Sequence, residues 1–298
     1  MWNQRSNSQS GECKTMTISV TLLGTGSPIP DPNRAGPATL ISVDNEKYLV
    51  DAGRGVLMRL AGALVGVGEL NGVLLTHLHS DHITDLNDVM TSYWVLGPPE
   101  GTLTIVGPPG TQEVVDAILA SLSRDVKYRM DHHDDLNLPP LLNVIEIAEG
   151  SVSLGGNVSI ECAPTDHKPV EPTVGYRFTH DGVSVVAAGD TVPCAGLDSL
   201  CEGADALVHT VIRKDLMKLS PNPRALDILD YHSSPEEAAQ TAQKSGVSTL
   251  IMTHYVPGLN LTNPAGDGQD WIDLAAQHFS GQIEVGDDLH RVEITKGE

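Results

Sequence analysis

The stretch "VLLTHLHSDHITD", from Val73 to Asp85, carries most of the information in this sequence. Three histidines and two aspartates follow directly after a short apolar run of the kind that forms a buried strand. Functional groups are often mounted where a rigid strand gives way to a loop. Imidazole and carboxylate side chains together suit divalent metals, with zinc as the default choice. The stretch therefore predicts a metal site.

The composition limits the classes of function. The chain has 298 residues, of which 40% are hydrophobic, and its formal net charge is −21. An acidic surface repels phosphate backbones, so neither DNA nor non-specific nucleic-acid binding is expected. The sequence contains no run of eighteen or more apolar residues, so we expect no membrane association.

The first sixteen residues are polar and lack the apolar segment of a signal peptide. We expect residues 1–16 to be a disordered leader and residues 17–298 to form a single domain. The four cysteines are scattered without a CxxC pair, which favours reduced thiols and a cytoplasmic location.

Strand-like and helical segments are mixed along the chain, which indicates α/β layers. The weakest pattern is at 123–143, where we expect a loop with an interrupted helix. The expected strands are 17–24, 38–43, 47–53, 72–77, 103–107, 144–148, 158–163, 174–178, 183–190, 206–211, 249–254 and 290–294, and the expected helices are 54–65, 82–94, 111–122, 234–246 and 271–279.

Further metal-binding side chains follow other strand-like runs. A single zinc takes three or four protein ligands, so a set of seven would serve two metals about 3.5–4 Å apart. The alternative is that these are ordinary polar loop residues. The set consists of His77, His79, Asp81, His82, His167, Asp190 and His254.

The order of these motifs resembles a known family. "LGTGSP", "VDAGRG", the HxHxDH motif "HLHSDH", "TDHKP", "AAGDTVPC" and "MTHYVP" follow one another as in the metallo-β-lactamase superfamily. They are similar to its ribonuclease Z and arylsulfatase branch, and most closely to actinobacterial, mycobacterial ribonuclease Z-like proteins. The resemblance extends from residue 17 to 298. It implies a four-layer αββα sandwich in which two mixed sheets pack face to face.

The resemblance also implies how the ligands are divided. One zinc would be held by three histidines, the other by Asp81 and two histidines, and Asp190 would bridge both. Mn²⁺ or Fe²⁺ could replace zinc, and a homodimer is expected by analogy. Asp51 is expected either to orient a ligand or to act as a structural turn carboxylate. The first group is His77, His79 and His167, and the second is Asp81, His82 and His254.

His232 is a candidate catalytic residue alongside Asp81. It precedes a capping box in which Ser234 and Glu237 flank a proline at the first helical position. A helix N-terminus favours anions, and the resemblance places this histidine against the scissile phosphate. We expect it to donate to the leaving group, and the alternative is a plain turn residue.

Two departures from the family pattern bear on the substrate. Ribonuclease Z has His-Glu where this chain has His209 and Thr210, so His232 lacks that carboxylate partner. The segment between His167 and Asp190 is also too short for the basic tRNA-binding arm of the bacterial enzymes. We therefore expect a dinuclear zinc phosphodiesterase in which a hydroxide bridging the metals attacks phosphorus in a small diester or RNA. The alternatives are an arylsulfatase, a tRNA 3′-processing endoribonuclease, and a non-enzymatic protein with structural zinc.

Overall fold

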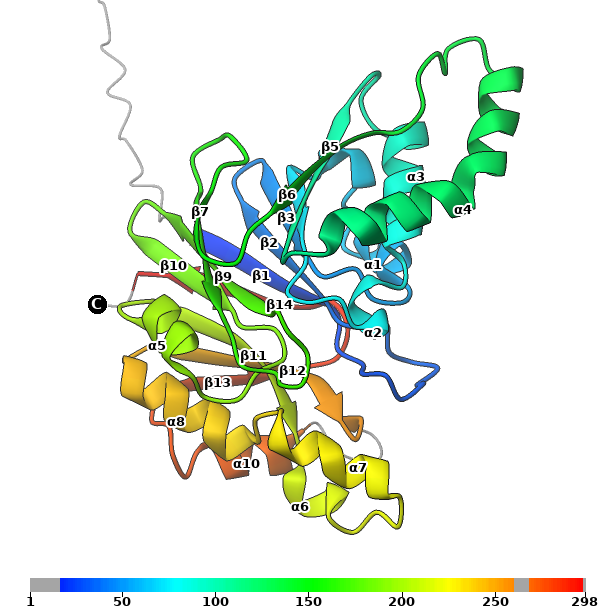
Figure 1. Cartoon of the computed structure of the whole chain (residues 1–298). Helices are drawn as coiled ribbons and strands as arrows, with labels where there is room; N and C mark the ends of the chain where they lie inside the picture. The colour runs from blue at the N-terminus through cyan, green and yellow to red at the C-terminus, as the bar shows by residue number, and fades with distance from the viewer. Residues whose placement is uncertain (1–16, 260–267, 297–298) are drawn as a thin grey trace, which may run out of the picture.

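The computed structural model describes residues 17–259 and 268–296. Two mixed sheets pack face to face, and helices cover their outer faces (Figure 1). This arrangement confirms the predicted α/β class and the αββα sandwich. The expected leader, residues 1–16, lies outside the described residues, and the single domain over 17–298 stays a prediction.

The first sheet has the strand order β14-β1-β2-β3-β4-β5-β6. Its first four strands pair antiparallel, whereas β3, β4, β5 and β6 pair parallel. Parallel strands end at the same edge of a sheet, and the HxHxDH motif follows β4 at that edge. The strands are β1 (Thr17–Gly24), β2 (Ala38–Val43), β3 (Glu46–Val50), β4 (Gly72–Leu74), β5 (Thr102–Gly107), β6 (Leu141–Glu146) and β14 (His290–Thr295).

The second sheet has the order β13-β12-β11-β10-β9-β8-β7. Strands β7 to β10 pair antiparallel, and β10 to β13 pair parallel. Asp190 follows β10, and His254 lies near the end of β12, so both are at the carboxyl edge of the parallel strands. The strands are β7 (Gly150–Val152), β8 (Ser159–Pro164), β9 (Val174–His180), β10 (Val183–Ala187), β11 (Ala206–Ile212), β12 (Thr249–Val256) and β13 (Gln282–Val285).

The helices divide between the two outer faces. The first sheet is covered by α1, α3 and α4, and the second by α5, α8 and α10 (Figure 1). Within the described part of the chain, no helix is long and apolar enough to cross a membrane. The helices are α1 (Val56–Gly62), η1 (Val67–Glu69), α2 (Ser80–Ile83), α3 (Leu86–Leu96), α4 (Thr111–His132), α5 (Ala195–Cys201), α6 (Lys214–Met217), α7 (Pro223–Asp227), η2 (Ile228–Asp230), α8 (Pro235–Ser245) and α10 (Gln269–Ala275).

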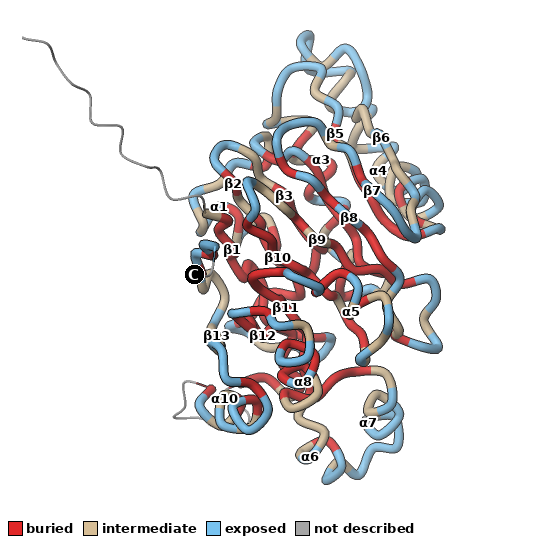
Figure 2. Tube along the Cα trace, turned by 90° about the vertical axis from the view of Figure 1, so that its left-hand side faces the viewer, coloured by how far each residue is buried: buried red, intermediate tan, exposed pale blue. Residues whose placement is uncertain are grey.

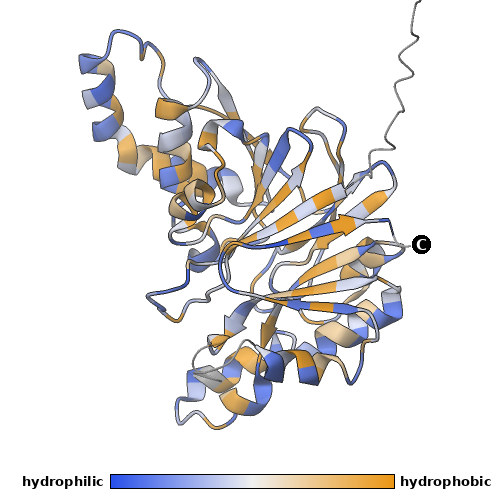
Figure 3. Ribbon diagram, turned by 180° about the vertical axis from the view of Figure 1, so that it is seen from behind, coloured by the Kyte–Doolittle hydropathy of each residue, from blue (hydrophilic) through white to orange (hydrophobic). Residues whose placement is uncertain are grey.

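Three apolar layers hold the four structural layers together. Successive residues of a strand point to opposite faces, and both faces of the central strands are apolar. Val185 packs between the sheets and its neighbour Val186 packs under the helices of the second sheet. Leu22 and Leu23 of β1 divide in the same way between the central layer and the layer under α1 and α3. Figures 2 and 3 show the buried, apolar strands in the middle of the molecule.

The structure corrects the expectation for residues 123–143. Helix α4 does not end at 122 but continues to His132, and β6 already begins at Leu141. The loop is therefore confined to residues 133–140. Two ion pairs with a spacing of four residues favour the helix over this stretch. They are Asp125–Arg129 at 2.7 Å and Lys127–Asp131 at 2.6 Å.

Other boundaries also differ. The helix expected at 82–94 is two helices, α2 and α3, separated by Thr84 and Asp85. Asp85 Oδ2 accepts a hydrogen bond from the Gly55 backbone N–H at 2.5 Å, which anchors the chain at this break. The sequence patterns did not predict β7 and β13. Both are short edge strands with mostly solvent-accessible residues, so neither has a marked apolar pattern.

Two leucines test the assignment of the central layer. Leu22 is fully buried between the sheets, whereas Leu96 is 73% exposed at the end of α3. Leu22→Ala should lower the free energy of unfolding by about 2–5 kcal/mol, because it leaves a cavity. Leu96→Ala removes the same atoms from the surface and should change it by less than about 0.5 kcal/mol. Urea unfolding followed by circular dichroism measures both variants, and equal losses would contradict this core.

Candidate metal centre

The seven side chains expected to bind metal meet where the carboxyl edges of the two sheets come together. They come from loops and strands far apart in the sequence, yet each has a potential ligand atom within 4.8 Å of those of two others. His77 and His79 follow β4, Asp81 and His82 lie in α2, His167 lies between β8 and β9, Asp190 follows β10, and His254 lies in β12.

Three histidines form the first group. The Nε2 atom of His77 lies 3.1 Å from Nδ1 of His79, and Nε2 of His167 lies 3.4 Å from the same atom. His77 and His167 are fully buried, and His79 is partly exposed. Three imidazole nitrogens thus lie close enough together to bind one metal ion.

The second group adds a carboxylate. Oδ2 of Asp81 lies 3.3 Å from Nε2 of His254 and 3.6 Å from Nε2 of His82. Oδ2 of Asp190 lies 3.5 Å from Nε2 of both His82 and His254, and 3.9 Å from Nε2 of His167. One Asp190 oxygen therefore faces both groups.

The local sequence explains how one short stretch contributes to both groups. Strand β4 is buried and ends at Leu74, so the chain leaves the sheet just before His77. His79 has an extended backbone and is the residue before α2. The four-residue helix then buries Asp81 and His82 and brings the His82 ring to 4.1 Å from the His77 ring, measured between centroids.

Hydrogen bonds fix the tautomers of two histidines. Nδ1 of His82 donates to Oδ2 of Asp51 at 2.8 Å, and Nδ1 of His167 donates to the carbonyl of Tyr231 at 2.8 Å. Because both partners can only accept, the proton is on Nδ1 and the lone pair of Nε2 points into the site. Asp51 thus makes the contact expected of a residue that orients a ligand.

Thr76 contributes to this arrangement but was not predicted from the sequence. Its N–H donates to Oδ1 of Asp51 at 2.8 Å, its hydroxyl donates to Oδ2 at 2.9 Å, and the hydroxyl oxygen lies 3.0 Å from Nδ1 of His77. The signal was present in the repeated "TH" of "VLLTH" and "LIMTH", where a threonine precedes a candidate ligand each time.

The donor set fits a divalent metal. In the described residues, Nε2 of His82 and Oδ1 of Asp190 are buried and have no hydrogen-bond partner. Buried lone pairs without partners are costly, and a cation would satisfy them. Five imidazoles and two carboxylates suit zinc and also related transition metals.

The electrostatics of the first group agree with ligand chemistry, whereas in the second group burial lowers the pKa of His82 and of His254 but Asp190 and its neighbours outweigh this effect and raise both. Burial lowers the pKa of His77, and neighbouring His82 lowers it further. Burial likewise lowers the pKa of His167 to about 4. Both imidazoles are therefore neutral near pH 7, which is the form that binds metal. Burial raises the pKa of Asp190, but His254 and His82 outweigh this effect and hold it well below its usual value.

Two residues of the site have strained backbones. Asp51 has a φ of 61° and His254 a φ of 55°, both in the left-handed region that favours glycine. Such a conformation costs on the order of 1–3 kcal/mol, and it persists only where the surroundings enforce it. The surrounding contacts therefore determine where these two side chains point.

His232 lies beside the seven candidate ligands. Ser234 and Glu237 form the predicted capping box of α8, and Pro235 is its first residue. Nδ1 of His232 donates to the carbonyl of Ile228 at 2.9 Å, and Nε2 lies 3.2 Å from Oδ2 of Asp190. His232 therefore has a carboxylate neighbour in Asp190.

Other candidates fall outside the centre. Asp85 belongs to the opening motif, but its carboxylate binds the Gly55 N–H and is in none of the potential metal groups. His209 is fully buried in β11, and its Nδ1 donates to the Thr210 carbonyl at 2.7 Å.

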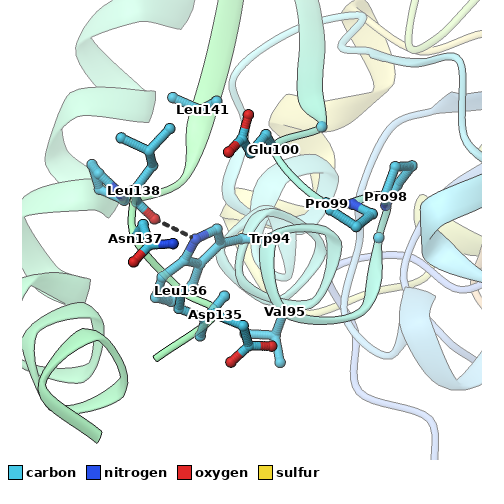
Figure 4. A pocket seen from close by; sticks show the side chains of 13 residues that line it. Trp94, Val95, Pro98, Pro99, Glu100, Asp135, Leu136, Asn137, Leu138 and Leu141 are labelled. Atoms are coloured by element: carbon cyan, nitrogen blue, oxygen red, sulfur yellow. Dashed lines mark hydrogen bonds between the residues drawn. The ribbon is translucent and has the colours of Figure 1, made fainter. Parts of the chain in front are cut away.

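A separate pocket of about 210 Å³ lies between the end of α3 and the loop after α4 (Figure 4). The Trp94 indole N–H donates to the Leu138 carbonyl across it at 2.9 Å. None of the candidate metal ligands lines this pocket, so it is not part of the centre.

Comparisons with known proteins agree with this geometry. Residues 46–255 match the family model described as a beta-lactamase superfamily domain. The chain is 57% identical over 279 residues to Ribonuclease Z of Mycolicibacterium paratuberculosis strain K-10, covering 93% of this chain and 98% of the relative. It is 56% identical to Ribonuclease Z of Mycolicibacterium gilvum, with 94% and 97% coverage.

Solved structures share the fold. The metallo-beta-lactamase fold protein YhfI from Bacillus subtilis gives a TM-score of 0.69 at 23% identity, covering 93% of this chain and 99% of the other. The short form of human tRNase Z gives 0.64 at 20% identity, with 92% and 98% coverage. The chain therefore belongs to the metallo-β-lactamase superfamily and, within it, to the ribonuclease Z family of hydrolases.

Proposed function

We propose that this protein is a dinuclear zinc phosphodiesterase that hydrolyses the phosphodiester bond of a small diester or of RNA. The observation that carries the proposal is the position of Asp190, whose Oδ2 lies 3.5–3.9 Å from histidine nitrogens of both groups. A carboxylate between two sets of ligands is suited to bridge two ions. Mn²⁺ or Fe²⁺ in place of zinc is compatible with the same donors.

The protein side chains would hold the two ions in distinct ways. His77, His79 and His167 would bind one, Asp81, His82 and His254 the other, and Asp190 both. When bound, such ions neutralise charge that develops at phosphorus and lower the pKa of water to give a nucleophile at neutral pH. Asp51 would keep the His82 ring in the ligand orientation.

His232 would deliver a proton to the leaving group. The Ile228 carbonyl accepts from Nδ1, so that nitrogen carries a proton. Nε2 lies 3.2 Å from Oδ2 of Asp190, so it faces the proposed metal site. A proton on Nε2 would thus be placed to pass to a leaving oxygen, which is general acid catalysis.

The second candidate is cleavage of tRNA 3′ ends. It is favoured by the name Ribonuclease Z of the curated relatives and by the fold shared with human tRNase Z. These relatives are covered to 97–98% of their length, so the short segment between His167 and Asp190 does not distinguish this chain from them. The net charge of −21 opposes strong binding to phosphate backbones and favours smaller substrates.

Assembly and location belong to the same proposal. A homodimer follows from the family resemblance, and a cytoplasmic location agrees with the scattered cysteines of the sequence. Multi-angle light scattering after size-exclusion chromatography measures the assembly directly.

A substrate panel tests the proposed activity. The protein, loaded with zinc or manganese, is incubated with bis-p-nitrophenyl phosphate, a short RNA, a pre-tRNA with a 3′ trailer, and p-nitrophenyl sulfate. We expect hydrolysis of the diester and the short RNA, and no efficient cleavage of pre-tRNA. Pre-tRNA cleavage at rates matching the diester would favour the second candidate, and sulfate hydrolysis alone would overturn the phosphodiesterase.

Asp190→Ala tests the bridging role. Because one carboxylate would serve both ions, the variant should lose affinity for both zinc equivalents and lose activity with them. Asp198→Ala is the matched control, since Asp198 pairs with Lys244 on the surface at 2.6 Å and should leave both unchanged. Zinc content is measured by mass spectrometry after dialysis. A folded Asp190→Ala protein that keeps two equivalents would remove Asp190 from the site.

His232→Ala tests the proton donor. The variant should lower kcat by about 10²–10⁴-fold for diesters with alkoxide leaving groups. The loss should be smaller for p-nitrophenyl esters, because that leaving group needs little protonation. Zinc content should be unchanged. Since His232 also lies within ligand distance of His167 and Asp190, a loss of zinc would show a ligand instead of an acid.

A further inference from the structure

The backbone around His254 has an unusual course. Strands β11 and β12 are in register at Thr210 and Thr253, but Ile212 then pairs with Val256. Two residues of β12, His254 and Tyr255, therefore lie opposite one residue of β11. Such a β-bulge re-aims a side chain, and here it coincides with the left-handed backbone of His254. The ladder with β11 does not by itself fix the direction of this candidate ligand.

The loop at 25–35 contacts the bulge from outside the pairing with β11. The N–H of Tyr255, the second residue of the bulge, donates to the carbonyl of Thr25 at 3.1 Å. The guanidinium of Arg34 lies over the Tyr255 ring, 5.8 Å from its centroid. The position of His254 thus depends on how firmly this loop is held.

Asp288 holds both ends of that loop. It lies in the turn before β14, and its side chain is only 5% exposed. Its carboxylate accepts from Thr25 N at 2.9 Å, Thr25 Oγ1 at 2.8 Å, Ala35 N at 2.7 Å and Arg59 Nε at 2.8 Å. A buried carboxylate with four donors is a strong and directional anchor.

Arg34 connects this anchor to the bulge. Its side chain is 2% exposed, and Nη1 donates to Thr25 Oγ1 at 2.6 Å. It also forms an ion pair with Asp287, the neighbour of Asp288. Thr25 is therefore bound from both sides, by Asp288 and by Arg34, and its own carbonyl binds the bulge.

We propose that Asp288 is a positioning residue that, through Thr25 and Arg34, holds the bulge at His254 and so sets the affinity of the second metal group. The inference rests on the two-ion site proposed above. Asp288 makes no contact with any candidate ligand among its hydrogen bonds and ion pairs. The first group is oriented by different residues, Thr76 and Tyr231, so the effect of Asp288 should be selective.

Zinc titration against a chromophoric chelator tests the proposal. In Asp288→Asn an amide N–H₂ replaces one carboxylate oxygen and faces a donor. One zinc equivalent should bind as in the wild type, and the other about 10–100-fold more weakly. A loss of this size is typical when a residue that orients a metal ligand is removed. Thr25→Val should show the same selectivity if Asp288→Asn fails to fold, because it removes only the hydroxyl.

Asp205→Asn is the matched control. Asp205 is also a buried carboxylate that accepts a backbone N–H, that of Ser184 at 2.8 Å, but it precedes β11 at the end opposite to the metal centre. This variant should lower stability without changing either zinc affinity. In a His254→Ala background, Asp288→Asn should not change the affinity of the remaining equivalent, because the bulge no longer carries a ligand.

The outcomes separate the two proposals. A wild-type titration that ends at one equivalent would contradict the two-ion site, and this inference with it. Two wild-type equivalents that both weaken equally in Asp288→Asn, or that both stay unchanged in it, would contradict the positioning role alone. The same selective loss in Asp205→Asn, or a further loss in the His254→Ala background, would also contradict it.

Discussion

The carboxylate of Asp190 is the constraint on which the site depends. It is buried, and it lies 3.2–3.9 Å from nitrogens of four histidines. Removing a carboxylate from water is costly unless positive charge is close by. Asp190 comes from the second sheet, whereas His82 comes from the first, so their approach requires the two sheets to be packed as they are. The geometry of the centre therefore depends on the packing of the two sheets.

This shared origin couples metal binding to the fold. The first sheet contributes the HxHxDH residues and Asp51, and the second contributes His167, Asp190 and His254. Because the ligands come together only in the folded chain, the free energy of binding adds to the stability of the sandwich. The left-handed backbones of Asp51 and His254 cost part of that stability. Thr76 binds the Asp51 carboxylate directly, and Asp288 binds Thr25, whose carbonyl accepts from the residue after His254.

Much of the fold could be predicted from the sequence because the central strands are apolar on both faces. Strands at 17–24 and 38–43 were predicted with the observed bounds. The edge strands β7 and β13 have no such pattern, and α4 was predicted too short although apolar residues at 119, 122, 126 and 130 continue its spacing. The seven candidate ligands came from motif order. Tyr231 and Asp288 could not be found in this way, because their roles depend on contacts between segments distant in the sequence.

X-ray diffraction at the zinc absorption edge, from crystals of the protein prepared with zinc, tests the central claim most directly. The account predicts two anomalous peaks per chain about 3.5–4 Å apart, with an oxygen of Asp190 between them. One peak should lie among His77, His79 and His167, and the other among Asp81, His82 and His254. A single peak, or two peaks without Asp190 between them, would contradict the account.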